Sequence, residues 1–230
     1  MQRLLAFLEI PVLVAVPASL AVCAALQLQQ AALLTMVVVL AAVVVFLAGY
    51  EASRPGLRQI MPSVVLAALA SAGRILFAPI PSVQPVSAVC VLAGVVFGRR
   101  CGFMVGALSA LVSNFFLGQG PWTPWQMYAW GLVGYFAGVL GQAHAFQRKP
   151  VVYIYGFLAS YLYSALLNAW YVIGYVSPIT PVSVGVAYLA ALPLDTAHAV
   201  STVVFLLLIF APWQRKLERI RTKYDLRLQE

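Results

Sequence analysis

The chain has 230 residues, of which 63% are hydrophobic and only 9% are charged, and its mean hydropathy is +0.94. This composition excludes an ordinary water-soluble domain, in which about a quarter of the residues are charged. The formal net charge is +8. Because the basic residues flank apolar runs, this charge indicates membrane topology and attraction to anionic lipid, and it does not require a nucleic-acid site.

Apolar runs of about 18–20 residues predict helices that cross the bilayer, because a hydrocarbon core of roughly 30 Å needs a helix of that length. About eight such runs follow one another, at 6–26, 31–50, 58–76, 83–98, 101–117, 124–142, 151–174 and 182–211. The predicted fold class is therefore an all-α integral membrane protein of the cell membrane.

Basic residues recur after every second predicted span, while the turns between them carry no charge. The basic groups are Arg3; Arg54 and Arg58; Arg99 and Arg100; Arg148 and Lys149; and the tail from Arg215 to Arg227. Since Lys and Arg accumulate in cytoplasmic loops, both termini are predicted to be cytoplasmic. Arg74 is the exception, because it lies near the outer end of its span.

The first apolar run has two alternative interpretations. Arg3 followed by apolar residues is also typical of a secretory signal peptide, and the segment 20–23 resembles a lipoprotein cleavage site ending in Cys23. The bulky Val22 before that cysteine, the length of the run and the span that follows at once favour a retained transmembrane hairpin.

A joint at 51–58, which combines charge with Pro and Gly, divides the chain. Before it lies an N-terminal hairpin, 1–52, of Ala, Val and Leu. Beyond it lie a six-helix core, 53–212, which contains nearly all the aromatic residues, and a basic cytoplasmic tail, 213–230. The chemistry is therefore expected in the core.

The densest group of polar and aromatic residues lies at the outer end of one core span and the start of the next. Gly and Pro residues there break the helix and fix a turn. Uncharged donors and acceptors alternate with flat apolar rings at Asn114, Gln119, Trp122, Thr123, Trp125, Gln126 and Trp130. This mixture favours a sizeable, mostly neutral, polar-aromatic ligand. An interfacial aromatic belt is the alternative, but a belt does not account for the amides between the rings.

Other polar residues lie inside the predicted spans. Arg74, just before the proline-rich turn 77–85, either faces an anionic or carbonyl group of a ligand or extends to the outer headgroups. Asn168 and Tyr171 lie toward the outer half of the penultimate span. They either complete a pocket or form hydrogen bonds between helices.

Asp195 and His198 share one helix face deep in the last span, because they are three residues apart. Ionisable residues at that depth indicate function by default, but we favour a structural pair that bonds to neighbouring helices. The sequence has no Walker A, zinc-protease or serine-nucleophile motif. We therefore expect no catalytic residues, no metal site, no cofactor and no energy source within this chain.

Small residues recur four positions apart, which lets helices approach closely in lipid. The pairs are Ala68 and Ala72, Gly102 and Gly106, and Gly134 and Gly138. The face that contains Ala68 and Ala72 is wide enough to accept a helix of a partner protein.

The order of these features resembles a known family. Six spans, an Ala-rich first helix, the proline turn after Arg74, the stretch from Asn114 to Gln126 and the late segment Leu192-Pro-Leu-Asp-Thr-Ala-His198 resemble the substrate-binding (S) components of energy-coupling factor (ECF) vitamin transporters. The resemblance covers residues 58–211. Within it, the segment 118–127 is most similar to the branch linked to cobalamin or related corrinoids. The N-terminal hairpin departs from the six-helix pattern.

The resemblance implies a prokaryotic plasma-membrane protein whose six helices form a vitamin pocket open to the outside. The polar and aromatic residues named above would contact the vitamin, with a corrinoid as the expected ligand. The small-residue face at Ala68 and Ala72 would meet a transmembrane coupling subunit that works with two cytoplasmic ATPases.

Other functions remain open at this point. An S component for a smaller vitamin or a precursor fits the same pattern. A secondary transporter would normally show internal repeats and a charged midplane site, and a membrane enzyme would need a nucleophile or a metal set. The sequence has no convincing repeat and few charges within its spans.

Overall fold

The structure is a computed structural model that describes residues 2–26, 30–53 and 55–224, without the side chains of residues 2–7 and 149. The described residues are helical apart from their connections. The elements are α1 (Gln2–Leu26), α2 (Ala31–Ala52), α3 (Leu57–Phe77), α4 (Val86–Phe97), α5 (Arg99–Leu117), α6 (Thr123–Gln142), the short 3-10 helix η1 (Ala145–Gln147), α7 (Lys149–Tyr175) and α8 (Pro181–Lys223).

The predicted fold class, an all-α integral membrane protein, is confirmed. Within the described ranges, six of the eight predicted spans are helices long and apolar enough to cross a membrane, namely α1, α2, α3, α5, α7 and α8. The span predicted at 124–142 is α6, which has 20 residues but is not among these six. The span predicted at 83–98 is a helix of only 12 residues, α4, which reaches roughly 18 Å and is too short to span the hydrocarbon core. It need not match the bilayer, because nearly all its residues are buried among other helices.

The helix ends follow from local chemistry. Gly98, with φ of 95°, separates α4 from α5, and Gly118, with φ of 108°, ends α5; both conformations suit a residue without Cβ. At the start of α8, Thr180 and Ser183 cap each other's backbone N–H groups at 3.1 and 2.9 Å, as in a capping box. These ends position the turn between α5 and α6 and the outer start of α8.

The last helix is longer than predicted. A span was expected at 182–211, but α8 continues through Pro212 to Lys223. Its final turns pack against the bundle, since Arg221 Nη1 donates a hydrogen bond to the Val96 carbonyl at 2.6 Å and Leu217 contacts the hydrophobic core. The division into hairpin, core and tail stays a prediction, but the described part of the tail lies against α4.

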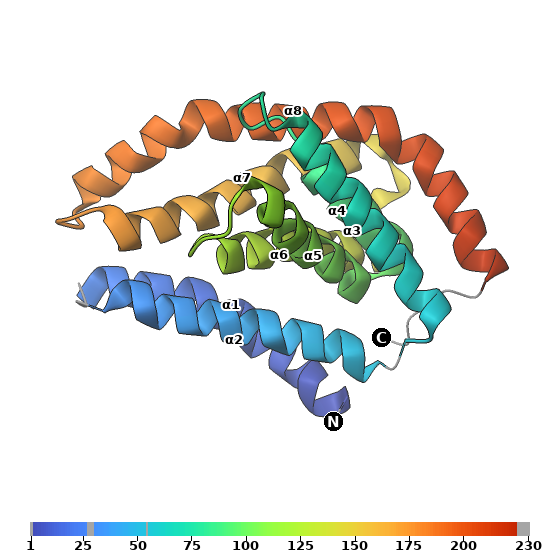
Figure 1. Ribbon diagram of the computed structural model, residues 1–230, viewed down its shortest axis with the longest axis horizontal. Helices are drawn as coiled ribbons and strands as arrows, with labels where there is room; N and C mark the ends of the chain where they lie inside the picture. The colour runs from blue at the N-terminus through green and yellow to red at the C-terminus, as the bar shows by residue number, and fades with distance from the viewer. Residues whose placement is uncertain (1, 27–29, 54, 225–230) are drawn as a thin grey trace.

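The helices form a bundle with α5 and α6 in its middle. In the view of Figure 1, the hairpin of α1 and α2 lies on one side of them and α7 and α8 lie on the other. The core is formed largely by α4, α5 and α6, where Phe103, Trp125 and Trp130 are fully buried or nearly so. The hairpin joins this core through Phe46, whose ring stacks on Phe103 with 4.1 Å between centroids.

Close helix packing confirms the prediction made from the glycine pairs. A Cβ on Gly102 of α5 would overlap the carbonyl oxygen of Gly134 on α6, and one on Gly134 would overlap that of Gly102. Gly106 faces the Trp130 backbone in the same way, and Gly138 faces Arg99. The two glycine pairs therefore let the first half of α5 and the second half of α6 lie in backbone contact.

Most basic residues gather at one end of the bundle. Arg99 and Arg100 lie where α4 meets α5, and Arg221 bonds to the last turn of α4. Arg58 shares a groove with Phe97 and the end of α8. This grouping agrees with the predicted cytoplasmic face. The structure does not describe four other basic groups, namely Arg54, Arg227 and the side chains of Arg3 and Lys149.

Candidate functional site

Arg74 lies in the last turn of α3, at the end of that helix opposite Arg58. Its Nη1 donates hydrogen bonds to Ser113 Oγ and Asn114 Oδ1 of α5, both at 2.6 Å. Its guanidinium carbon lies 4.9 Å from the ring centroid of Trp130 on α6, which permits a cation–π contact. The single basic residue outside the cytoplasmic pattern therefore joins three helices.

Asn114 extends this contact into the turn between α5 and α6. Its Nδ2 donates to Thr123 Oγ1 at 2.9 Å and to Gln126 Oε1 at 2.8 Å. Thr123 Oγ1 in turn donates to Gln119 Oε1 at 2.9 Å. Six of the residues predicted from sequence thus form one connected cluster. We refer to Arg74, Asn114, Gln119, Thr123, Gln126 and Trp130 as the outer cluster.

Trp130 connects the outer cluster to the interior. Its indole Nε1 donates to Ser87 Oγ of α4 at 3.2 Å, and Ser87 Oγ lies 2.9 Å from His198 Nε2 of α8. Tyr163 of α7 stacks on the Trp130 ring with 4.5 Å between centroids. The site is therefore supported by side chains from α4, α7 and α8 as well as by the helices that carry it.

Four other residues predicted from sequence lie outside the outer cluster. Trp125 is buried within the bundle, whereas Trp122 is 37% exposed at the turn. Asn168 Nδ2 donates to Asp195 Oδ2 at 2.8 Å. The exposed ring of Tyr171 stacks on Tyr175, one turn further along α7. Their role in ligand contact stays a prediction.

The intramembrane pair does not bond to itself. Although Asp195 and His198 share a face of α8, Asp195 contacts Asn168 of α7 and His198 contacts Ser87 of α4. Each residue therefore joins α8 to a different helix, which is the arrangement expected of residues that hold a bundle together. Their structural role remains a prediction. In the part of the chain that the structure describes, no cluster of metal-ligating side chains occurs.

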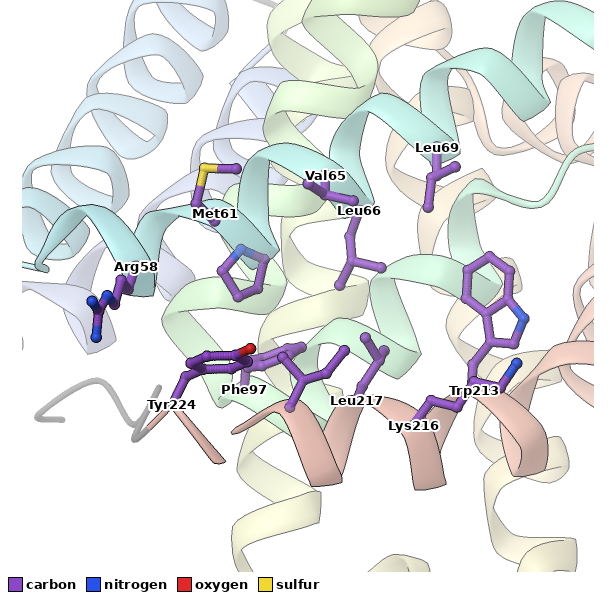
Figure 2. A pocket seen from close by; sticks show the side chains of 12 residues that line it. Arg58, Met61, Val65, Leu66, Leu69, Phe97, Trp213, Lys216, Leu217 and Tyr224 are labelled. Atoms are coloured by element: carbon purple, nitrogen blue, oxygen red, sulfur yellow. The ribbon is translucent and has the colours of Figure 1, made fainter. Parts of the chain in front are cut away.

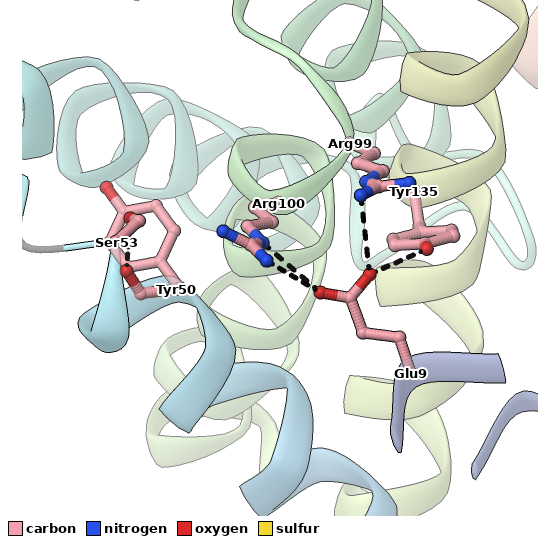
Figure 3. Close-up of polar contacts among 6 residues, drawn as sticks. All are labelled: Glu9, Tyr50, Ser53, Arg99, Arg100 and Tyr135. Atoms are coloured by element: carbon pink, nitrogen blue, oxygen red, sulfur yellow. Dashed lines mark hydrogen bonds and ion pairs between the residues drawn. The ribbon is translucent and has the colours of Figure 1, made fainter. Parts of the chain in front are cut away.

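A second polar cluster at the opposite end of the bundle was missed in the sequence. Glu9 of α1 is buried, and its Oε1 lies 3.2 Å from Arg100 Nη2 while its Oε2 lies 3.8 Å from Arg99 Nη2. Tyr135 of α6 donates its hydroxyl to Glu9 Oε2 at 2.9 Å. Figure 3 shows the carboxylate between the two guanidiniums and the tyrosine. The sequence did contain a signal for this cluster, because Glu9 is an acidic residue inside the apolar run 6–26.

The outer cluster offers several kinds of contact to a ligand. Amides and a hydroxyl provide both donors and acceptors, one guanidinium provides positive charge, and the exposed Trp122 beside the cluster provides a flat apolar surface. Gln119 and Trp122 are exposed at its edge, while Asn114 is nearly completely buried. Such a set can bind a polar organic molecule, and it contains no nucleophile paired with a base.

Comparison with known families agrees with the arrangement of these helices. The family model described as the S component of ECF-type riboflavin transporters matches residues 58–213, which is more than half of the chain. The chain belongs to the S components of ECF transporters. No curated protein and no solved structure matches it.

Membership in this family identifies the chain as a transporter subunit of the cell membrane, with a vitamin as ligand and an ECF module as partner. The family is not one of enzymes. The matched range begins at Arg58 and ends at Trp213, so it contains the outer cluster and excludes α1 and α2. The cobalamin branch suggested by segment 118–127 is not confirmed, since the matching model is of the riboflavin type.

Proposed function

We propose that this S component captures a vitamin from the outside at the outer cluster and delivers it through a transmembrane coupling subunit powered by two separate ATPases. The family match over residues 58–213 carries this proposal. The outer cluster supports it, because Arg74, Asn114 and Trp130 converge from three helices at the end of the bundle away from most basic residues.

The proposed ligand is riboflavin or a vitamin with a comparable flat ring. The description of the matching family supports a flavin. Burial supports a smaller ligand than a corrinoid, because Trp125 and Trp130 are fully buried and leave Trp122 as the exposed indole of the turn. A flat ring with polar edges would use one or two aromatic faces and a few amide partners.

A corrinoid is the second candidate. The similarity of segment 118–127 to the cobalamin-linked branch favours it, as do the exposed Gln119 and Trp122 at the edge of the outer cluster. Equilibrium dialysis of the purified chain against riboflavin and cobalamin, each alone and in competition, separates the two. We expect riboflavin to be retained and an excess of cobalamin not to displace it; the reverse result would establish the corrinoid assignment.

Reconstitution in liposomes tests whether this chain needs the coupling subunit and ATPases for transport. The purified chain alone in liposomes should not accumulate vitamin against a gradient, with or without a proton gradient. Addition of the coupling subunit and ATPases, with ATP on their side, should start accumulation. Proton-driven accumulation by this chain alone would instead establish a secondary transporter and give Asp195 and His198 a role in proton transfer.

A further inference from the structure

Arg74 is the one cationic side chain of the outer cluster, and only its Nη1 bonds to other described side chains. Nη1 donates to both Ser113 Oγ and Asn114 Oδ1. Nε and Nη2 form no hydrogen bond with the described residues, and neither of these two nitrogens is buried. Together they form one edge of the planar guanidinium, and such an edge matches two oxygens of a carboxylate or a phosphate. Arg74 therefore presents a pair of donors in the geometry that an oxyanion takes.

The contacts of Arg74 turn its guanidinium toward the bundle and away from the outer headgroups. Ser113 and Asn114 of α5 are 0% and 1% exposed, and Trp130, over whose ring the guanidinium lies, is fully buried. An arginine that reaches for headgroups extends its charged end away from the protein interior toward water. Of the two roles that the sequence left open for Arg74, this direction favours contact with a ligand over contact with lipid.

No acidic side chain in the described part of the chain neutralises this cation. The acidic residues that the structure describes are Glu9, Glu51, Asp195 and Glu218. Asp195 accepts a hydrogen bond from Asn168, and the other three lie near the basic end of the bundle. A half-buried cation without a counterion is unfavourable, and neutral oxygens and one aromatic ring offset this only in part. An anion bound at Arg74 would supply the counter-charge.

We propose that the vitamin bound at the outer cluster carries a phosphate, which Arg74 binds through Nε and Nη2. This inference rests on the proposed function, in which the ligand has a flat, flavin-like ring. Riboflavin is neutral and brings no counter-charge to Arg74. Its 5′-phosphate ester keeps the same ring and adds a charge of roughly −1.5 to −2 at neutral pH. Riboflavin 5′-phosphate is therefore the preferred ligand, and riboflavin binds at the same site more weakly.

Equilibrium binding to the purified full chain tests this preference. Riboflavin and riboflavin 5′-phosphate are titrated separately in the same detergent and salt, and the ratio of their dissociation constants is the readout. We expect the ester to bind about tenfold more tightly, as a hydrogen-bonded pair with a charged group would provide. Arg74→Gln should bring the ratio close to one, and Arg74→Lys, which keeps the charge without the planar edge, should retain part of the preference.

Arg58→Gln is the matched control, because it removes the same charge from the other end of α3. Arg58 is exposed in the first turn of that helix, and Figure 2 shows it at the helix start, before Met61. The ratio should be the same in this variant as in the wild type. A ratio that falls equally in Arg58→Gln and Arg74→Gln would assign the preference to overall charge and overturn the proposal.

Two further results separate this inference from the function on which it rests. If the wild type binds both flavins with equal affinity, or if Arg74→Gln weakens both equally and leaves the ratio unchanged, the phosphate contact is overturned and vitamin capture stands. Arg74 would then act only through its bonds to α5. Binding of neither flavin by the folded wild type would overturn the flavin assignment together with this inference.

Discussion

Glu9 of α1 and Arg100 of α5 form a buried ion pair between segments that are 91 residues apart in the chain. The pair connects the N-terminal hairpin to the core, although the family match begins only at Arg58. Arg99 and Tyr135 contact the same carboxylate. The hairpin is therefore held to the S-component core by charge as well as by apolar packing.

Replacing Glu9 with Gln should destabilise the protein by about 3–5 kcal/mol, because removing one partner of a buried pair leaves charge without its counterion. Glu51→Gln is the control, since Glu51 is exposed near the end of α2. Thermal unfolding in detergent measures both variants. Equal melting temperatures for Glu9→Gln and the wild type would show that this cluster does not stabilise the fold.

Replacing Gly134 with Ala should also destabilise the protein, by about 1–3 kcal/mol or more, because the added methyl group overlaps the Gly102 backbone and overpacking forces the helices apart. Gly185→Ala is the matched control on α8, where an added Cβ meets open space. That variant should be neutral or stabilising by up to about 1 kcal/mol. Unfolding curves that rank the two variants in the opposite order would contradict the packing of α5 against α6.

The helices were predictable because apolar runs, Gly–Pro turns and basic loops mark them directly. The short α4 and the long α8 were not predicted in full. Helix α4 is surrounded by protein, so its length is not set by the bilayer, and α8 continues past Pro212 because its final turns pack on α4. Both outcomes depend on tertiary contacts that a hydropathy pattern does not contain.

The site was predictable in composition but only partly in arrangement. The clustering of amides and rings around 114–130 identified most of the outer cluster, and the position of Arg74 outside the basic pattern identified that residue separately, but its hydrogen bond to Asn114 was not predicted. The sequence did not indicate that Ser87 and Tyr163 support Trp130. Helices distant in the chain supply these contacts, and single Ser and Tyr residues carry no distinctive signal in apolar spans.

Topology can be tested with single cysteines, since the native Cys23, Cys90 and Cys101 are all buried. In a background without these cysteines, Gln119→Cys and Thr180→Cys should react with an impermeant reagent from outside. Arg148→Cys and Lys223→Cys should react only after the membrane is opened. External labelling at position 223 with protection at position 119 would invert the proposed orientation.

Coupling should depend on the small-residue face of α3. Ala68 and Ala72 are both exposed, so A68L or A72L should leave vitamin binding nearly intact yet prevent copurification with a coupling subunit, because added bulk separates two helices. Ala190→Leu, at an exposed alanine of α8, is the control and should assemble normally. Normal assembly and transport by both α3 variants would exclude this face as the partner surface.

Equilibrium binding of vitamin to the purified, folded chain tests the central claim most directly. We expect saturable binding of riboflavin, and we expect Gln126→Ala, which removes a group from the outer cluster, to weaken it roughly ten- to a hundredfold. Gln142→Ala, at the opposite end of the same helix, should bind like the wild type. Binding of neither riboflavin nor cobalamin by the folded wild type, or equal affinity in Gln126→Ala and the wild type, would contradict vitamin capture at the outer cluster.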